Sequence, residues 1–319
     1  MNYSGVLRIV FLMSVLSDAY GKIGHNVYMY KNVNGKPGPD DWPNQYPACR
    51  GRSQSPIDIR TEATIYSPYL TEFIFSRPSP RSKFIVHNNG HAIQVNTEGN
   101  FYLHRGGLGN VYSTVQLHFH WGDSDQHGSE HTVNGASYPL EMHIVNWNSD
   151  KYVSVAEAMK HKDGIAVLGV HFEISTNDNT VLDPIIQAIQ QVTDPDWDNR
   201  VELTAMSIRN LLPKNACRYY RYHGSLTTPE CQESVIWTVF AEKLTISERQ
   251  LSVFRRCLQP TSNGHGSSSS HSALPQQGNA TPIRESLVNN YRPVQPLHGR
   301  HVYRSYSLWP GAQSFATFF

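Results

Sequence analysis

The chain has 319 residues, 39% of them hydrophobic, and its 27 basic and 26 acidic side chains leave a net charge of +1. A chain of this length can bury a sizeable core, and single β-rich domains often reach about 200 to 250 residues. The balanced charge gives no reason to expect a nucleic acid or an anionic membrane as partner, and we expect one domain with appendages.

Residues 1–19 are typical of a secretory signal peptide, with Arg8 before the short apolar run 9–16 and small residues that suit cleavage after Ala19. The run is too short to span a bilayer as a helix, and no other stretch is long enough. Segment 305–319 does not fit a lipid-anchor signal, because Pro310 and Gly311 interrupt its apolar residues. The sequence therefore predicts a secreted, extracellular protein without a membrane anchor, which we take to be a monomer.

The predicted elements that follow are mostly strands. Residues 31–51 are rich in Gly, Pro and Asn and predict a loop with one short helix. Alternating apolar segments predict strands at 84–86, 93–95, 115–121, 140–147, 165–172 and 234–240. Short helical patterns occupy 153–160, 183–191 and 248–257. The expected fold class is mainly β (α+β), with a large, mostly antiparallel twisted central sheet and short peripheral helices.

The composition changes between Gln259 and Thr281, where Gly, Ser and Gln predominate. Such a segment cannot bury enough apolar surface to offset the entropy lost on ordering. We therefore expect a disordered insertion at about 259–281 within a domain spanning 20–306, followed by a tail from 307 to 319. Asn279 begins a glycosylation motif inside this insertion.

Three histidines stand on two of the predicted strands. Strand alternation directs Gln116, His118 and His120 to one face, although a His-x-His pair alone is more often packed than metal-binding. The later strand adds His143 on the same face as Glu141. Three imidazoles with an open fourth position are the ligand set of a catalytic zinc. Metal-bound imidazoles need oxygen acceptors, and Gln116 and Glu141 each stand two residues before a histidine.

With further motifs in the same order, this pattern resembles the α-class carbonic anhydrases over about residues 28–306. The matching stretches are 38–42, 54–59, 88–92, 116–122, 128–133, 141–148, 224–229 and 290–297. The resemblance implies Zn²⁺ held by His118, His120 and His143. It also implies reversible hydration of carbon dioxide to bicarbonate and a proton by zinc-bound hydroxide, since zinc lowers the pKa of its water to about 7 in carbonic anhydrases.

The resemblance also implies roles for residues near the zinc. Thr227 would accept a hydrogen bond from the hydroxide while donating its own hydrogen to Glu130, and Thr228 would help to position bicarbonate. His131 and Asn290 would stand behind the ligands, as Gln116 and Glu141 do. An apolar wall for carbon dioxide would consist of Val145, Val167, Leu226, Val235 and Trp237.

Fast turnover needs a proton relay with a pKa near ambient pH, and histidine is the natural choice. His91 occupies the shuttle position implied by the resemblance, with Asn89 and Gln94 holding the water chain. Tyr30 is expected to join them. The segment after Tyr30 is longer than usual in the family, so Tyr28 competes for this role.

Four cysteines in an exported chain can pair in three ways. The resemblance to extracellular family members implies a bond between Cys49 and Cys231, and leaves Cys217 and Cys257 to pair with each other or to remain thiols. One departure stands beside this bond, because Glu230 replaces the second proline of the usual Thr-Thr-Pro-Pro. A cis bond before a non-proline residue costs about 2.5 to 4 kcal/mol, so we expect this loop to turn trans or to store strain.

Two other functions compete with this interpretation. A non-catalytic extracellular binding or matrix protein could retain the fold, but the intact ligands, with Thr227, Glu130 and His91, argue against it. A cupin-like iron dioxygenase also uses His-x-His on a strand. Such enzymes place a ligand glutamate shortly after the pair, and 121–125 contains none.

Overall fold

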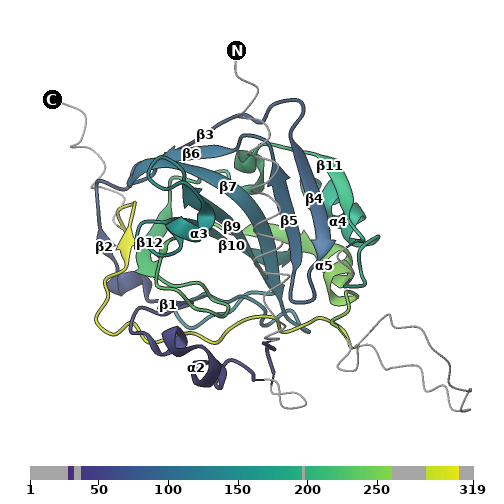
Figure 1. The fold of residues 1–319 in the computed structure, drawn as a ribbon, viewed down its shortest axis with the longest axis horizontal. Helices are drawn as coiled ribbons and strands as arrows, with labels where there is room; N and C mark the ends of the chain where they lie inside the picture. The colour runs from purple at the N-terminus through teal and green to yellow at the C-terminus, as the bar shows by residue number, and fades with distance from the viewer. Residues whose placement is uncertain (1–27, 32–36, 196–197, 261–284, 309–319) are drawn as a thin grey trace, which may run out of the picture.

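The computed structural model describes residues 28–31, 37–195, 198–260 and 285–308 (Figure 1). The predicted signal peptide at 1–19, nearly all of the insertion with Asn279, and the tail from 309 onward lie outside these residues. No helix in the described ranges is long and apolar enough to cross a membrane.

A 13-stranded mixed sheet dominates the described residues. Its main path runs through β11 (Val201–Thr204), β4 (Lys83–Asn88), β5 (Ile93–Glu98), β7 (Leu108–Trp121), β9 (Leu140–Asn148), β10 (Ile165–Ser175), β13 (Val235–Phe240), β12 (Tyr219–Gly224), β15 (Tyr303–Arg304) and β2 (Ile65–Tyr66). Off this path, β3 (Phe73–Phe75) pairs with β6 (Tyr102–Arg105), β6 with β7, and β14 (Leu244–Ser247) with β10. A separate small sheet joins β1 (Asp58–Ile59) to β8 (Thr132–Val133).

The expected large, mainly antiparallel sheet is confirmed, and it also contains parallel pairs. β10 runs parallel to both β13 and β14, and β15 runs parallel to β2. The first eight residues of β10 are all buried, as is typical of a strand covered on both faces. Each predicted strand segment falls on an observed strand, whereas β7 begins earlier than predicted, at Leu108.

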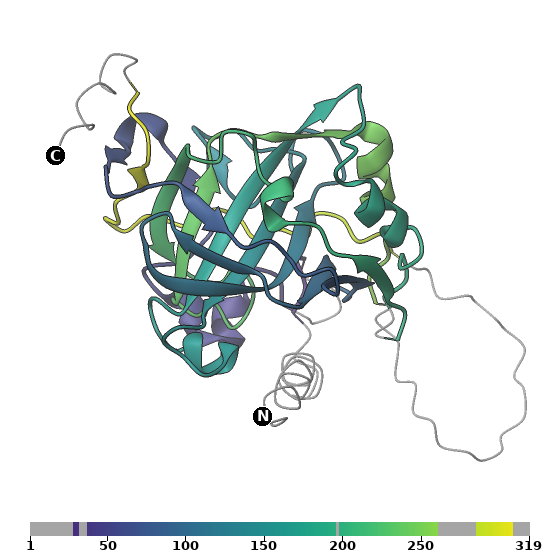
Figure 2. The ribbon, with the colours of Figure 1, turned by 90° about the horizontal axis from the view of Figure 1, so that it is seen from above.

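The helices are short and lie around the sheet, as predicted. They are α2 (Trp42–Gln45), α3 (Val155–Ala158), α4 (Asp183–Ile189) and α5 (Glu248–Arg255), with 3-10 turns η1 (Pro47–Arg50), η2 (Thr61–Ala63) and η3 (Ile208–Leu211). α5 begins with a capping box, in which Ser247 and Gln250 each bond the other's backbone. α4 and α5 lie together at one side of the sheet, far from α2 (Figures 1 and 2).

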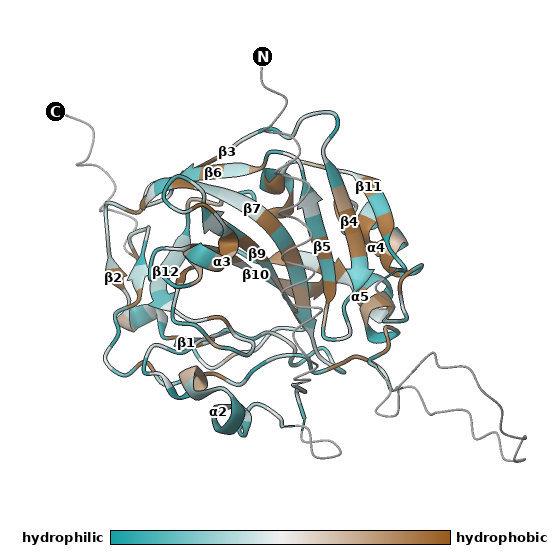
Figure 3. Ribbon diagram, viewed as in Figure 1, coloured by the Kyte–Doolittle hydropathy of each residue, from teal (hydrophilic) through white to brown (hydrophobic). Residues whose placement is uncertain are grey.

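The main apolar core lies on one face of the central strands. Leu117, Phe119 and Trp121 of β7 are fully buried there, and the rings of Phe119 and Trp121 pack on Phe254 of α5. Figure 3 shows apolar residues along β4, β5 and β7. Burial of one such side chain stabilises the fold by about 1.5 to 3 kcal/mol. Because strand residues alternate, the polar residues between these three face the opposite side of the sheet.

The cysteines divide into one bond and two thiols. Cys49 and Cys231 form the expected disulfide, with Cα atoms 5.0 Å apart. Cys217 is exposed and Cys257 is buried, so these two do not pair with each other. Burial raises the pKa of the Cys257 thiol to about 12. In the loop beside Cys231 the bond between Pro229 and Glu230 is cis, so a trans bond, the first of the two expected outcomes, is wrong.

Candidate metal centre

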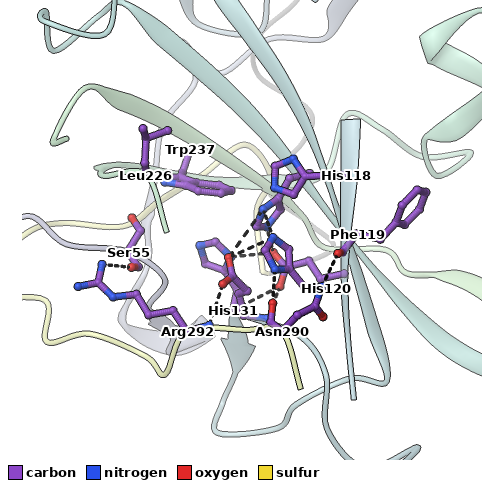
Figure 4. Close-up of polar contacts among 12 residues, drawn as sticks. Ser55, His118, Phe119, His120, His131, Leu226, Trp237, Asn290 and Arg292 are labelled. Carbon is purple, nitrogen blue, oxygen red and sulfur yellow. Dashed lines mark hydrogen bonds and ion pairs between the residues drawn. The ribbon is translucent and has the colours of Figure 1, made fainter. Parts of the chain in front are cut away.

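The three predicted histidines come together where β7 and β9 run side by side. In their antiparallel register His118 lies opposite His143, and His120 lies opposite Glu141. One ring nitrogen from each histidine lies within 4.8 Å of the other two. Figure 4 shows the rings of His118 and His120 on one side of β7 and the ring of Phe119 on the other. Strand alternation therefore places the three rings as the sequence predicted.

In each ring, the nitrogen that points away from the other two histidines donates a hydrogen bond. Nδ1 of His118 donates to Oε1 of Gln116 at 2.9 Å, Nδ1 of His120 to the carbonyl oxygen of Asn290 at 2.7 Å, and Nε2 of His143 to Oε1 of Glu141 at 2.7 Å. A neutral imidazole carries a single N–H, so the remaining nitrogen of each ring presents a lone pair.

These bare nitrogens face one another, with Nε2 of His120 only 3.1 Å from Nδ1 of His143. Two lone pairs at this distance repel each other unless a positive charge lies near both. A cation at the point where the three nitrogens converge removes this repulsion. The donor set of three imidazoles therefore fits a zinc ion and leaves its fourth position open.

The surroundings favour neutral rings, which is the form that binds metal. His120 and His143 are buried, whereas His118 remains partly exposed. Burial lowers the pKa of His143 to about 3. Burial, together with the neighbouring rings of His120 and His143, also lowers the pKa of His118 well below its usual value. The His118 and His143 rings are therefore neutral at neutral pH, and neither has to lose a proton before it binds a metal.

Glu141 is the hydrogen-bond acceptor that holds the His143 ring from the side opposite the metal centre. Its side chain is fully buried and accepts four hydrogen bonds. Oε1 accepts from His143 and, at 2.8 Å, from Nδ1 of His131, while Oε2 accepts from the backbone N–H groups of Glu130 and His131. A carboxylate held by this many donors cannot turn away, so it fixes the orientation of the His143 ring.

Asn290, which is distant in sequence, fixes the orientation of the His120 ring. Its carbonyl oxygen accepts from His120, and its Oδ1 accepts from the backbone N–H of Trp121 at 2.8 Å. Its Nδ2 donates to the carbonyl oxygens of Phe119 and His91. Asn290 thus ties β7 to the segment carrying His91, as Figure 4 shows for its contact with His120.

Glu130 is buried beside the three rings and is not a surface carboxylate. Its Oε1 accepts from the backbone N–H of Arg292 at 2.8 Å, and its Oε2 lies 3.5 Å from Nε2 of His120. Burial raises the pKa of Glu130, while His120 and the hydroxyl of Thr227 lower it to a smaller extent. The Thr227 hydroxyl lies within hydrogen-bonding reach of the Glu130 carboxylate, and both residues are buried, so the predicted pair lies together beside His120.

The predicted apolar wall lies beside the rings. Val167 on β10 is the cross-strand neighbour of Val145 on β9 and of Trp237 on β13. The Trp237 ring is 4.8 Å from the ring of His143. Leu226 and Val235 belong to the same apolar cluster, and Figure 4 shows Leu226 and Trp237 together on one side of the histidines.

Ring contacts at the rim distinguish the two competing tyrosines. The ring of His91 stacks on Tyr28, with centroids 4.2 Å apart and planes 13° from parallel. Tyr30 instead packs edge-on against Tyr28 and Trp42, and burial raises its pKa well above the usual value. Of the two competing tyrosines, Tyr28 is therefore the one in ring contact with His91.

Asn89 and Gln94 form a second part of the rim. Nδ2 of Asn89 donates to Oε1 of Gln94 at 2.9 Å, and Gln94 lies opposite His118 in the register of β5 and β7. Oδ1 of Asn89 accepts from the backbone N–H of His91. Asn89 and Gln94 therefore link His91 to the strand that carries His118.

Thr228 lies next to Thr227 and is partly exposed.

Sequence reasoning missed several buried residues that support the site. Nη1 of Arg292 donates to Oε1 of Gln54 and to the carbonyl oxygen of Ser55, both at 2.9 Å. The hydroxyl of Tyr222 lies 2.7 Å from Nε2 of His131 and donates to Ser55 Oγ. Gln54, Ser55 and Arg292 stand in stretches that carried the resemblance, but nothing local in the sequence marks a buried arginine. Burial lowers the pKa of Arg292 to about 10.

Comparisons with known proteins agree with this geometry. Residues 37–306 match the family described as eukaryotic-type carbonic anhydrase. The chain is 37% identical to carbonic anhydrase 12 of Homo sapiens over 276 residues, which covers 86% of this chain and 72% of that protein. It is 35% identical to carbonic anhydrase 7 of Mus musculus over 286 residues, covering 89% of this chain and 98% of the relative.

Proposed function

We propose that His118, His120 and His143 hold a zinc ion and that His91 shuttles protons. The basis is that the chain belongs to the eukaryotic-type carbonic anhydrase family and is a zinc-dependent carbonic anhydrase. The reaction is the reversible hydration of carbon dioxide to bicarbonate and a proton. The observation that carries the proposal is the convergence of three bare ring nitrogens, each opposite a nitrogen that donates to a fixed acceptor.

When bound, zinc lowers the pKa of a water molecule to about 7, as is known for carbonic anhydrases, and so supplies a nucleophile near neutral pH. Gln116, Asn290 and Glu141 hold the three rings in orientation and keep their tautomers fixed. Because each acceptor binds the nitrogen remote from the metal, each ring offers its other lone pair. The partly exposed edge of His118 leaves that side open to solvent and substrate.

Thr227 and Glu130 orient the nucleophile. Glu130 has only acceptor oxygens when ionised, so the Thr227 hydroxyl donates its hydrogen to the carboxylate and is left to accept. A hydroxyl that can only accept binds a nucleophile that still carries a proton and rejects one that does not. Support comes from the burial of both groups and from Oε1 of Glu130, which Arg292 already occupies. Thr228, next in the chain, is placed to contact bicarbonate.

Carbon dioxide binds on the apolar wall. The molecule has no net charge, so a site for it needs apolar contact beside the nucleophile and no polar clamp. Val145, Val167 and Trp237 supply a continuous surface across three neighbouring strands. Leu226 and Val235 complete it, since both belong to the same cluster.

His91 carries the proton from the site to the solvent. Histidine is the side chain best suited to accept and release a proton near neutral pH. The stacked ring of Tyr28 holds His91 at the rim, and Asn89 and Gln94 provide polar groups between it and His118. We assign the supporting aromatic role to Tyr28, with Tyr30 as its partly buried neighbour.

The protein acts outside the cell. Disulfides persist in oxidising compartments, and Cys49 and Cys231 are bonded. Production of the full chain in a secreting animal cell line tests this, with the protein expected in the medium and lacking residues 1–19. Retention inside the cell with those residues intact would contradict it.

Stopped-flow measurement of carbon dioxide hydration by the purified protein tests the function. We expect rapid hydration that is abolished by one equivalent of a zinc-binding sulfonamide. A protein that contains zinc but does not hydrate carbon dioxide would instead be a non-catalytic binding or matrix protein that retains the fold.

A further inference from the structure

An open cleft of about 550 Å³ is lined by none of the three histidines of the metal centre. It runs between η1, the segment after α3, and the residues that follow Cys231 in the chain. Its polar lining includes Arg50 from η1, Lys160 and Lys162 from the segment after α3, and Gln232, Glu233 and Ser234. None of these residues takes part in the site described above.

The lining carries more positive than negative charge. Arg50 and Lys162 form no ion pair with any residue that the structure describes, and Nη2 of Arg50 donates to the neutral amide oxygen of Asn44 at 2.8 Å. Lys160 pairs with Glu157 at 2.8 Å. The Oε1 atom of Glu233 already accepts from the backbone N–H of Ser53 and from Nε2 of Gln54. Unpaired cations around a hollow concentrate anions there, so the charge favours an anionic ligand.

Two buried polar atoms in this lining have no hydrogen-bond partner within the described ranges. They are Oγ of Ser234, a residue only 2% exposed, and Oε1 of Gln232. Nε2 of Gln232 donates to Oε2 of Glu230 at 2.9 Å, so Oε1 is the atom of this amide that is left without a partner. Buried polar atoms are almost always hydrogen-bonded, so two orphans in one lining indicate a missing partner.

The chemistry of the two atoms specifies that partner further. The Ser234 hydroxyl can donate, and it suits a negatively charged oxygen. The amide oxygen of Gln232 can only accept, so its partner must bring a hydrogen. A ligand that satisfies both atoms and also meets the cationic side chains of the lining therefore carries negative charge and keeps an O–H group.

We propose that this cleft binds a small oxyanion that retains a hydroxyl group, either hydrogencarbonate or hydrogen phosphate. Its charged oxygens accept from Arg50, Lys162 and Ser234, and its O–H donates to Gln232. Because both orphan atoms are buried, binding includes a rotation of the two side chains towards the cleft. Sulfate has the charge but no O–H at neutral pH, and it serves as the discriminating probe.

A nuclear magnetic resonance titration of the full zinc-loaded chain tests this, with a sulfonamide on the metal so that anions act only elsewhere. Sodium phosphate, sodium hydrogencarbonate and sodium sulfate are added at matched ionic strength. We expect saturable shifts of the Lys162 and Ser234 amides with one or both of the first two anions. Sulfate should bind about three to ten times more weakly, because it cannot donate to Gln232. Whichever of phosphate and hydrogencarbonate binds more tightly identifies the ligand of the cleft.

Three variants and one control separate a built site from general charge attraction. Ser234→Ala and Lys162→Gln should each weaken binding by about tenfold, and Gln232→Leu should remove the preference over sulfate. Lys214→Gln removes an exposed lysine outside the cleft and should change nothing. Equal shifts with phosphate and sulfate, or a Lys162→Gln protein that titrates like Lys214→Gln, would overturn the proposal. The titration reads binding and not turnover, so its outcome is independent of the proposed function.

Discussion

The metal centre and the His91 rim lie in one molecule but are held in different ways. The centre stands on two adjacent strands, and each of its rings has an acceptor behind it. The rim stands on a turn after β4, where His91 is held by its ring contact with Tyr28 from near the N-terminus of the described chain. Side-chain positions on regular strands can be predicted from strand alternation. The position of His91 at the rim depends instead on contacts between segments far apart in sequence.

The largest expected effect comes from breaking the centre itself. His120→Ala should abolish zinc binding and carbon dioxide hydration, because two imidazoles do not complete the ligand set of a catalytic zinc. His161→Ala, which removes a surface histidine stacked on Tyr152, is the matched control and should retain both. Zinc analysis with stopped-flow assay checks the pair. Full zinc content in His120→Ala would mean that the metal is held elsewhere.

Thr227→Val tests the chemistry next to the centre without touching a ligand. It keeps the size of the side chain and removes the hydroxyl, and we expect kcat/KM to fall about 10²-fold with zinc content unchanged. Thr227→Ser keeps the hydroxyl and should recover most of the activity. If Thr227→Val and Thr227→Ser behave alike, the hydroxyl does not orient the nucleophile.

Glu141→Ala tests whether the acceptor behind a ring matters as much as its burial suggests. His143 would lose the partner of its Nε2, and zinc affinity should fall about 10- to 100-fold. Competition with a chelator measures the change. Glu173→Ala removes an exposed carboxylate on the same sheet and serves as the control. Unchanged affinity in Glu141→Ala would show that the strands alone position the ring.

His91→Ala should separate the rim from the centre. Turnover in weak buffer should fall by at least about tenfold while zinc content stays the same, because only the proton relay is lost. Added imidazole should restore part of the turnover. Tyr28→Ala, with His91 intact, should have a smaller effect of the same kind. Unchanged turnover in His91→Ala at low buffer would remove the shuttle assignment.

A histidine outside both regions gives the smallest effect, seen only in pH dependence. Burial, and then Arg200, lowers the pKa of His87 on β4 to about 4. The unfolded chain binds a proton below about pH 6.5, which the folded chain takes up only near pH 4. Stability should therefore fall between these values by up to about 3 kcal/mol. His87→Phe should flatten this part of the profile in urea unfolding at pH 7, 6 and 5. Parallel profiles would contradict it.

Much of the centre could be predicted from the sequence because its cause is local. Alternation alone places His118 and His120 on one face, and their spacing from Gln116 reveals one acceptor. The third acceptor could not be found this way, since Asn290 lies 170 residues from His120. Its assignment came only from the resemblance, as did the pairing of Cys49 with Cys231.

The parts of the fold that could not be predicted share a non-local cause. β10 pairs in parallel with β13 but antiparallel with β9, and an apolar run that is buried on both faces does not reveal the direction of either neighbour. The two-residue strands β1, β2 and β15 exist only through pairing with distant segments. The choice between Tyr28 and Tyr30 likewise depends on which ring reaches His91, and that is a tertiary contact.

X-ray absorption at the zinc edge of the purified protein, combined with the zinc stoichiometry, tests whether three histidine rings hold the metal. We expect one zinc per chain, bound by three imidazole nitrogens at about 2.0 to 2.1 Å and by one oxygen ligand. We also expect this signal to disappear in His120→Ala. Sulfur in the coordination shell, fewer than three imidazoles, or an unchanged spectrum in that variant would contradict it.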